Sequence, residues 1–87
     1  MIKFKQIDSG EIHALSYKEV IKLFFESEIS RENRNLVVNV MLFLEAYASE
    51  NQITFHLINE NDWSRLIHIA SNFQEEKSKR LNFQPNS

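Results

Sequence analysis

The sequence contains no cysteine, and this absence removes several kinds of chemistry at once. Disulfide bonds, thiolate zinc sites and cysteine nucleophiles all require that residue. The fold must therefore be held together by its hydrophobic core alone. An absence of cysteine also fits a reducing compartment, so we expect a cytoplasmic protein.

Glycine and proline occur once each among the 87 residues. Turn-rich β-sandwiches use both residues repeatedly, so their scarcity favours a largely helical fold. The phosphate-binding loops of nucleotide-binding proteins need two or more glycines at fixed spacing, which this chain cannot supply. We therefore expect no nucleotide or other cofactor. The one glycine, Gly10, follows Asp8 and Ser9 in a pattern that predicts a tight turn.

Long apolar runs are also missing. The longest, Val40 to Leu44, is far shorter than the roughly 20 residues that a membrane-spanning helix needs. The opening residues, MIKFKQIDSG, lack the apolar segment of a secretory signal. We expect no membrane partner.

One stretch, NLVVNVMLFLEAYA at residues 35–48, is nevertheless strongly apolar. Asn39 and Glu45 are the only polar residues inside it. At helical spacing its apolar side chains nearly surround the axis, which is typical of a buried helix. We predict a central helix at about 31–51, capped by Ser30 or starting later, near Asn35.

Shorter elements flank this helix. Residues 2–7 alternate apolar side chains with lysines, which predicts a half-buried strand at a sheet edge. Residues 11–15 are expected to form a helical turn or a loop. Ser16 to Glu19 has the S-x-x-E spacing of a capping box, and this predicts a helix at 17–28.

The second half predicts a strand at 53–58, ITFHLI, and a third helix at 63–80. The order is β-α-α-β-α. We therefore predict a mainly helical α+β fold, with three helices packed around the central one and two short strands that pair with each other. Residues 1–83 are expected to form one domain, and 84–87 a loose tail.

No catalytic pattern is visible. The histidines, His13, His56 and His68, have no partner at the spacing of metal ligands. No serine lies in a G-x-S-x-G turn. A chain of this length also offers little depth for a cleft that would separate the pKa values of two carboxylates. We expect neither an enzyme nor a metal site.

Charge is distributed unevenly. The net charge is −2, but residues 35–64 carry four acidic residues and no lysine or arginine. Trp63 lies at the end of this acidic segment. An aromatic anchor among carboxylates is typical of a surface that binds a basic partner tightly. The predicted contact residues are Glu45, Glu50, Glu60, Asp62 and Trp63, with His56 at the edge.

These features lead to the hypothesis of a small non-catalytic inhibitor, an immunity or antitoxin-type protein. A nuclease-like toxin needs positive charge to hold phosphate, so an acidic surface can occupy its active site. Phe24 and Phe25 suggest additional apolar surface, which leaves a homodimer open. The net negative charge argues against nucleic acid as the main partner.

Two alternatives stay open. Short helix, loop, long helix, loop and short helix, at 17–28, 31–51 and 63–80, resembles the element order of the histone fold, which implies a handshake dimer that binds DNA. A dimeric DNA-binding regulator could instead use the strand IKFKQ and its lysines. The basic cluster from Lys77 to Arg80 follows a helix, where cations are favoured by the helix dipole in any case.

Overall fold

The computed structural model describes the backbone of residues 1–82 and the side chains of residues 1–77. The tail predicted for 84–87 lies outside the described residues. Within them, the prediction of a mainly helical α+β fold is confirmed: three α-helices accompany a three-stranded antiparallel sheet.

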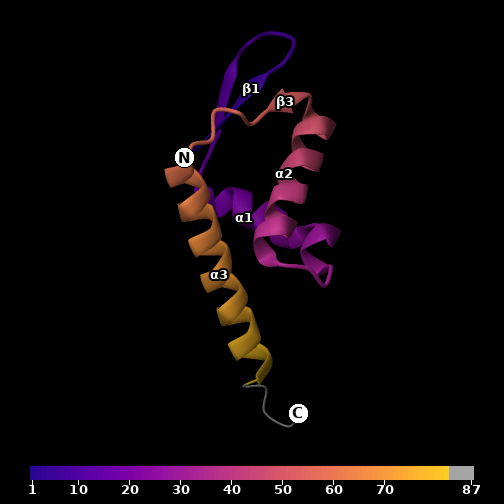
Figure 1. Cartoon of the computed structure of the whole chain (residues 1–87), viewed down its shortest axis with the longest axis vertical. Helices are drawn as coiled ribbons and strands as arrows, with labels where there is room; N and C mark the ends of the chain where they lie inside the picture. Colours follow the sequence, from indigo (N-terminus) through magenta and orange to yellow (C-terminus); the bar gives the residue numbers. More distant parts are fainter. Residues whose placement is uncertain (83–87) are drawn as a thin grey trace.

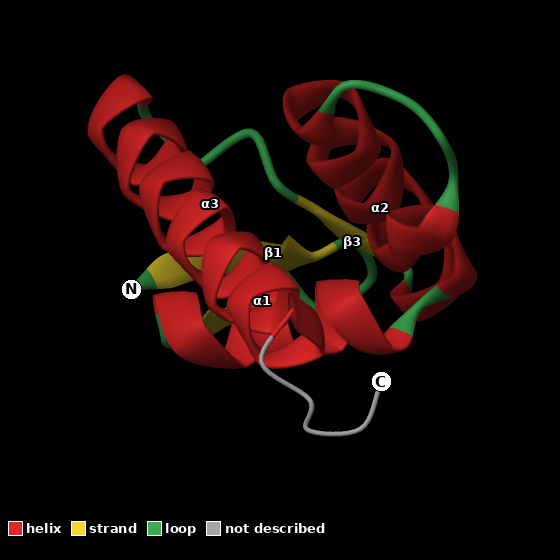
Figure 2. Ribbon diagram, turned by 90° about the horizontal axis from the view of Figure 1, so that it is seen from below, coloured by secondary structure: helices red, strands yellow, loops and turns green. Residues whose placement is uncertain are grey.

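The elements follow one another along the chain as β1 (Ile2–Gln6), β2 (Ile12–Leu15), α1 (Tyr17–Glu26), the 3₁₀ turn η1 (Glu28–Arg31), α2 (Leu36–Asn51), β3 (Ile53–Thr54) and α3 (Glu60–Asn82). Helices α2 and α3 run in opposite directions, α1 crosses behind them, and the strands lie toward one end (Figure 1). Seen from below, α2 and α3 lie on either side of the strands (Figure 2).

Strand β1 is the centre of the sheet, between β2 and β3. Its predicted alternation is confirmed, because Ile2 and Phe4 are buried while Lys3 and Lys5 are exposed. The prediction of an edge position is wrong. The lysines mark the solvent-facing side of a sheet that is covered on one face only, and such alternation does not depend on having a free edge.

Strand β2 corrects the expectation of a helical turn or loop at residues 11–15. The predicted turn is present, with Gly10 in the left-handed region at φ 74° and its N–H donating to the Gln6 carbonyl at 3.0 Å. The turn closes a β1–β2 hairpin in which Ile2 faces Leu15. Because most of β2 is exposed, its side chains carry no buried stripe, and the strand is defined by main-chain pairing.

Strand β3 is shorter than the predicted 53–58. Its pairing with the first strand is confirmed, since Lys5 faces Thr54. The chain then turns, and the Ile58 N–H donates to the Phe55 carbonyl at 3.0 Å. Phe55 and Ile58 both pack against the core from this turn. The apolar run therefore reflects two half-buried side chains in a turn, not a longer strand.

Helix α1 begins as its capping sequence predicts, with the Ser16 Oγ accepting from the Glu19 N–H at 3.1 Å. It ends at Glu26, two residues before the predicted end. The Ser27 hydroxyl donates to the Phe24 carbonyl at 2.6 Å and closes the last turn.

Helix α2 begins at Leu36, so the earlier start at about 31 is wrong. Ser30 lies in η1, where its hydroxyl donates to the Ser27 carbonyl at 2.8 Å. The cap is Asn35, whose Oδ1 accepts from the Val37 N–H at 2.8 Å. At the other end Gln52 adopts a left-handed φ of 54°, and its N–H donates to the last carbonyls of the helix.

Asn39 is the one buried polar residue among the described side chains, and only 3% of it is exposed. Its Nδ2 donates to the Glu32 carbonyl at 3.0 Å, and its Oδ1 accepts from the Arg34 Nε at 2.9 Å. Asn39 therefore holds the loop between η1 and α2 against the helix.

Helix α3 begins at Glu60, before the predicted Trp63, because Asn59 caps it. The Asp62 N–H donates to the Asn59 Oδ1 at 2.9 Å, and the Asn59 N–H donates to the Asp62 Oδ2 at 3.3 Å. The helix has 23 residues and α2 has 16, so the middle helix is not the longest, in contrast to the histone-like element order.

The core lies where the sheet and the three helices meet. Helix α2 supplies Val40, Phe43, Leu44 and Ala48 to it. The other buried apolar residues are Ile2, Phe4, Val20, Ile21, Phe24, Ile53, Leu66 and Ala70. This core covers only one side of α2. Because α2 is apolar almost all round, apolar side chains on its other side remain exposed.

Candidate protein-binding site

The side of α2 that the core leaves uncovered forms one wall of an open groove. Val37 and Met41 remain 41% and 46% exposed there. Helix α3 forms the other wall. The groove has a volume of about 730 Å³ and is lined by Val37, Met41, Trp63, Ser64, Ile67, His68 and Ser71. Most of this lining is apolar, and its polar side-chain groups are two hydroxyls, one imidazole and the indole N–H of Trp63.

Trp63 lies at the start of α3 and is half-buried. It packs against the core and also lines the groove. Ile67, one turn later, does the same. His68 lies beside Asn72, with 3.3 Å between the His68 Nε2 and the Asn72 Nδ2. The groove therefore presents a fixed aromatic surface, because the core holds Trp63 from behind.

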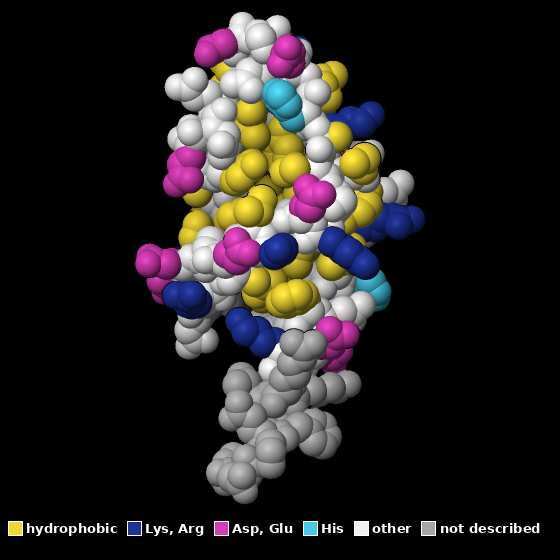
Figure 3. All heavy atoms as spheres, turned by 180° about the vertical axis from the view of Figure 1, so that it is seen from behind, with side chains coloured by type: hydrophobic (Ala, Val, Ile, Leu, Met, Phe, Trp, Pro, Cys, Tyr) yellow, Lys and Arg dark blue, Asp and Glu magenta, His cyan; other side chains and the backbone are white. Residues whose placement is uncertain are grey.

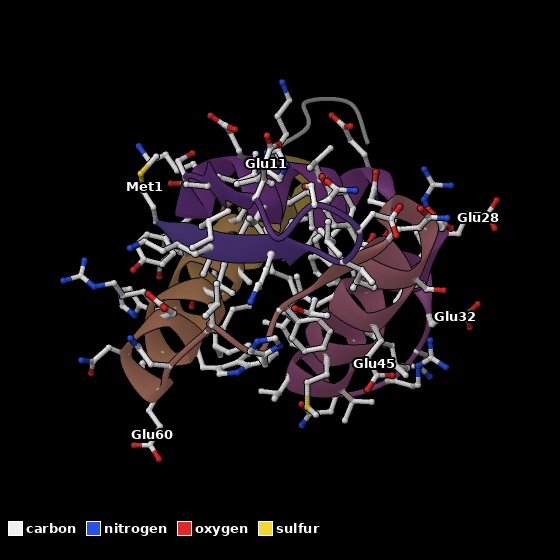
Figure 4. The ribbon with its side chains drawn as sticks, turned by 90° about the horizontal axis from the view of Figure 1, so that it is seen from above. Met1, Glu11, Glu28, Glu32, Glu45 and Glu60 are labelled. Carbon is white, nitrogen blue, oxygen red and sulfur yellow. The ribbon has the colours of Figure 1, made fainter. Side chains whose placement is uncertain are left out.

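Exposed carboxylates continue the rows of residues that line the groove. Glu45 follows Met41 by four residues on α2, so it lies one turn further along the same face. Glu60 precedes Ser64 by four residues on α3, and Glu75 follows Ser71 by four. Figure 4 shows Glu60 and Glu45 on the two helices, on either side of the space between them and pointing outward.

The basic side chains that the structure describes on or next to these helices are engaged elsewhere. The Arg65 guanidinium lies over the Tyr17 ring, 5.9 Å from its centre. The Lys77 ammonium lies 6.0 Å from the centre of the Phe25 ring. Arg34, just before α2, donates to Asn39. No lysine or arginine is among the groove-lining residues in the described part of the chain.

The opposite face differs in charge. Figure 3 looks onto the α1 side, where hydrophobic side chains gather at the centre and both signs of charge surround them. The groove differs from this face because no lysine or arginine is among its described lining residues. Two of its bordering carboxylates, Glu45 and Glu60, belong to the acidic segment of residues 35–64.

Asp62 has an internal role. The Tyr17 hydroxyl donates to its Oδ1 at 2.7 Å, which joins the start of α1 to the start of α3. This hydrogen bond lowers the pKa of Asp62 and raises the pKa of Tyr17. The carboxylate is half-buried and does not line the groove.

The six predicted contact residues thus do not form one cluster. Trp63 lines the groove, Glu45 and Glu60 lie one helical turn beyond its lining residues, and Asp62 faces Tyr17. Glu50 and His56 are exposed and do not line the groove. Sequence reasoning missed Val37, Met41 and Ile67. A signal for the first two was present, because a helix that is apolar on every side cannot be buried on every side in so short a chain.

The described residues contain no group of three or more histidine, aspartate and glutamate side chains placed to hold a metal ion. No helix in the described part of the chain is long and apolar enough to cross a membrane. The groove offers apolar contact and hydrogen bonds from hydroxyl, imidazole and indole groups, and the carboxylates that border it attract positive charge. Comparison with protein families, curated proteins and solved structures gave no match to this chain.

Proposed function

We propose that this protein is a non-catalytic binding module that neutralises a basic protein partner, as an inhibitor, immunity protein or antitoxin does. One observation carries the proposal. An open apolar groove containing Trp63 is bordered by exposed glutamates on both of its helices, and no lysine or arginine is among its described lining residues.

The two parts of this site have different physical roles. Half-buried aromatic residues in a well-packed groove are the usual centres of binding energy in protein interfaces. Carboxylates at the rim contribute mainly by attracting a cationic partner and by rejecting acidic ones. A toxin that acts on nucleic acid must hold phosphate with positive charge, so covering that charge would block it. The proposal places both proteins in the cytoplasm.

The test compares two double charge reversals. Glu45→Lys with Glu60→Lys alters the groove border, whereas Glu28→Lys with Glu32→Lys makes the same change in charge at exposed positions around η1. Tagged wild-type protein and both variants are used to capture partners from cells that carry the gene, and bound proteins are quantified by mass spectrometry. Circular dichroism establishes that each variant is folded.

We expect one basic protein to be captured in equimolar amount by the wild type and by the η1 variant. The groove variant should retain about a tenth or less, which corresponds to a loss of about 1.4 kcal/mol or more. Equal capture by all three proteins would refute the proposal. Retention on duplex DNA that falls steeply with salt, without a protein partner, would refute it in favour of the DNA-binding alternative.

A further inference from the structure

The α2–α3 groove is specific enough in shape and charge to indicate what kind of element enters it. We infer that the groove binds a single amphipathic helix of the partner, with apolar side chains on Trp63 and Met41 and with lysines or arginines facing the bordering glutamates. This inference rests on the proposed function and specifies the structural element that is recognised.

Main-chain hydrogen bonding favours a helix over an extended segment. Both walls of the groove are α-helices, whose N–H and C=O groups are bonded internally. An extended segment lying there would have no strand edge to pair with and would leave its own polar groups unsatisfied against apolar side chains. A helix satisfies its main chain internally and offers only side chains to the groove.

The dimensions agree with a short helical stripe. From Trp63 to Ser71 the lining of α3 covers about 12 Å, at 1.5 Å per residue. On a partner helix, apolar residues at positions i, i+3 or i+4, and i+7 cover about 10 Å. Three apolar side chains of one helix face therefore match the length of the groove.

The charges select a cationic helix. Helices α2 and α3 run in opposite directions, with the strands near the end of α2 and the start of α3 (Figure 1). Glu45 in the second half of α2 and Glu60 at the start of α3 therefore lie toward the sheet end of the groove, and Glu75, further along α3, lies toward the other end. Basic residues flanking the apolar stripe would meet carboxylates at both ends. An acidic helix would meet like charge, and no lysine or arginine is among the described residues that line the groove.

Other occupants fit less well. The groove is open along one side, so it cannot enclose most of a small ligand, as binding pockets usually do. A second copy in a symmetric groove-to-groove contact would bring together two surfaces that both carry bordering glutamates, with no lysine or arginine among the described lining residues to pair with them. A cationic helix avoids both difficulties.

Trp63 makes the inference directly measurable, because it is the only tryptophan in the chain. The probe is a synthetic peptide of about 18 residues, or five helical turns, with a leucine stripe flanked by lysines and no aromatic residue. One control peptide has the same composition in scrambled order, and another has glutamate in place of lysine. Tryptophan emission is followed during titration of the full chain with each peptide.

We expect the amphipathic lysine peptide to shift the Trp63 emission to shorter wavelength and to saturate at one peptide per protein. The scrambled peptide should bind about tenfold or more weakly, since it cannot present its apolar residues on one face. The glutamate peptide should not bind.

Two neighbouring valines supply the matched variants. Val37 lines the groove and is 41% exposed, whereas Val38 is 42% exposed and does not line it. Since both side chains are exposed, glutamate should be tolerated by the fold at either position. We expect Val37→Glu to weaken peptide binding about tenfold or more and Val38→Glu to change it little.

Each contrary result has its own meaning. Equal binding of the amphipathic and scrambled peptides would overturn the helix inference and leave the proposed function standing if binding still depends on Glu45 and Glu60. Binding unaffected by the glutamate reversals would overturn the proposed function as well. A dimer in light scattering that Val37→Glu converts to monomer would assign the groove to a second copy and overturn the inference.

Discussion

Replacing Asn39 with alanine tests how the chain positions the groove. Asn39 joins α2 to the loop before it through the Glu32 carbonyl and the Arg34 guanidinium. That loop leads directly into the first turn of α2, where Val37 lines the groove. Removal of the amide should release the loop and destabilise the whole domain, because Asn39 is buried.

The magnitude follows from the two bonds. The bond to the Glu32 carbonyl is a neutral one, worth about 1 kcal/mol net. A hydrogen bond to a charged group is worth about 1.5–3 kcal/mol, and the exposure of Arg34 places this one at the lower end. Alanine returns about 0.5 kcal/mol through its higher helix propensity. We expect a net loss of about 2 kcal/mol, or a fall of about 8–16 °C in melting temperature for a domain of this size.

Urea denaturation followed by circular dichroism measures this loss. The matched control is Asn51→Ala, which removes an exposed asparagine of the same helix whose Nδ2 donates only to the Tyr47 carbonyl. The control should change the free energy of unfolding by about 0.5 kcal/mol or less. If Asn39→Ala were no more destabilising than Asn51→Ala, the loop would not depend on Asn39 and the reasoning would be refuted.

Three further predictions concern the scaffold. Tyr17→Phe should lower the melting temperature near neutral pH, and the difference in melting temperature from the wild type should narrow at both low and high pH. The pKa of Asp62 is lowered in the folded protein, so the stability that its carboxylate contributes is lost as pH falls below about 4. The pKa of Tyr17 is raised, so the stability that its hydroxyl contributes is lost as pH rises above about 10. A difference that stays constant in melts from pH 2 to 11 would contradict this coupling. Gln52→Gly should raise the free energy of unfolding by about 0.5 kcal/mol in urea denaturation. The energy gained by relieving the strain of a left-handed backbone at residue 52 should exceed the entropic cost of the more flexible unfolded chain. A loss of stability would show that the Gln52 side chain matters more than its backbone. Leu66→Ala should cost about 2–5 kcal/mol, since Leu66 is fully buried, and a loss below about 1 kcal/mol would show that the core collapses around it.

The parts of this fold that the sequence predicted are those with a local physical cause. Alternation of Ile2 and Phe4 with lysines reports a strand with one face covered. The Ser16 hydroxyl caps α1 from a spacing that is visible in the sequence. The unusually apolar stretch of residues 35–48 located α2.

The remaining features depend on contacts between distant residues. Strand β2 is defined by its main-chain bonds to β1 and is mostly exposed, so its sequence shows little apolar pattern. The central position of β1 depends on both partners, one of them about 48 residues away at Thr54. Nothing in the sequence around Asp62 indicates that the Tyr17 hydroxyl donates a hydrogen bond to its carboxylate. The groove requires knowledge of which side of α2 the core covers, which periodicity cannot supply for a helix that is apolar all round.

The order of the strands has a consequence for synthesis on the ribosome. β1 is made first, yet its contact with β3 must wait until residues 53 and 54 have been added. At about 5–20 residues per second, this interval lasts roughly 2–10 s. During it, the hairpin with β2 is the only sheet pairing available to β1, and the core that covers Ile2 and Phe4 still lacks Ile53 and the α3 residues Leu66 and Ala70. The alternating Lys3 and Lys5 give the nascent strand a positive charge that discourages premature pairing with other chains.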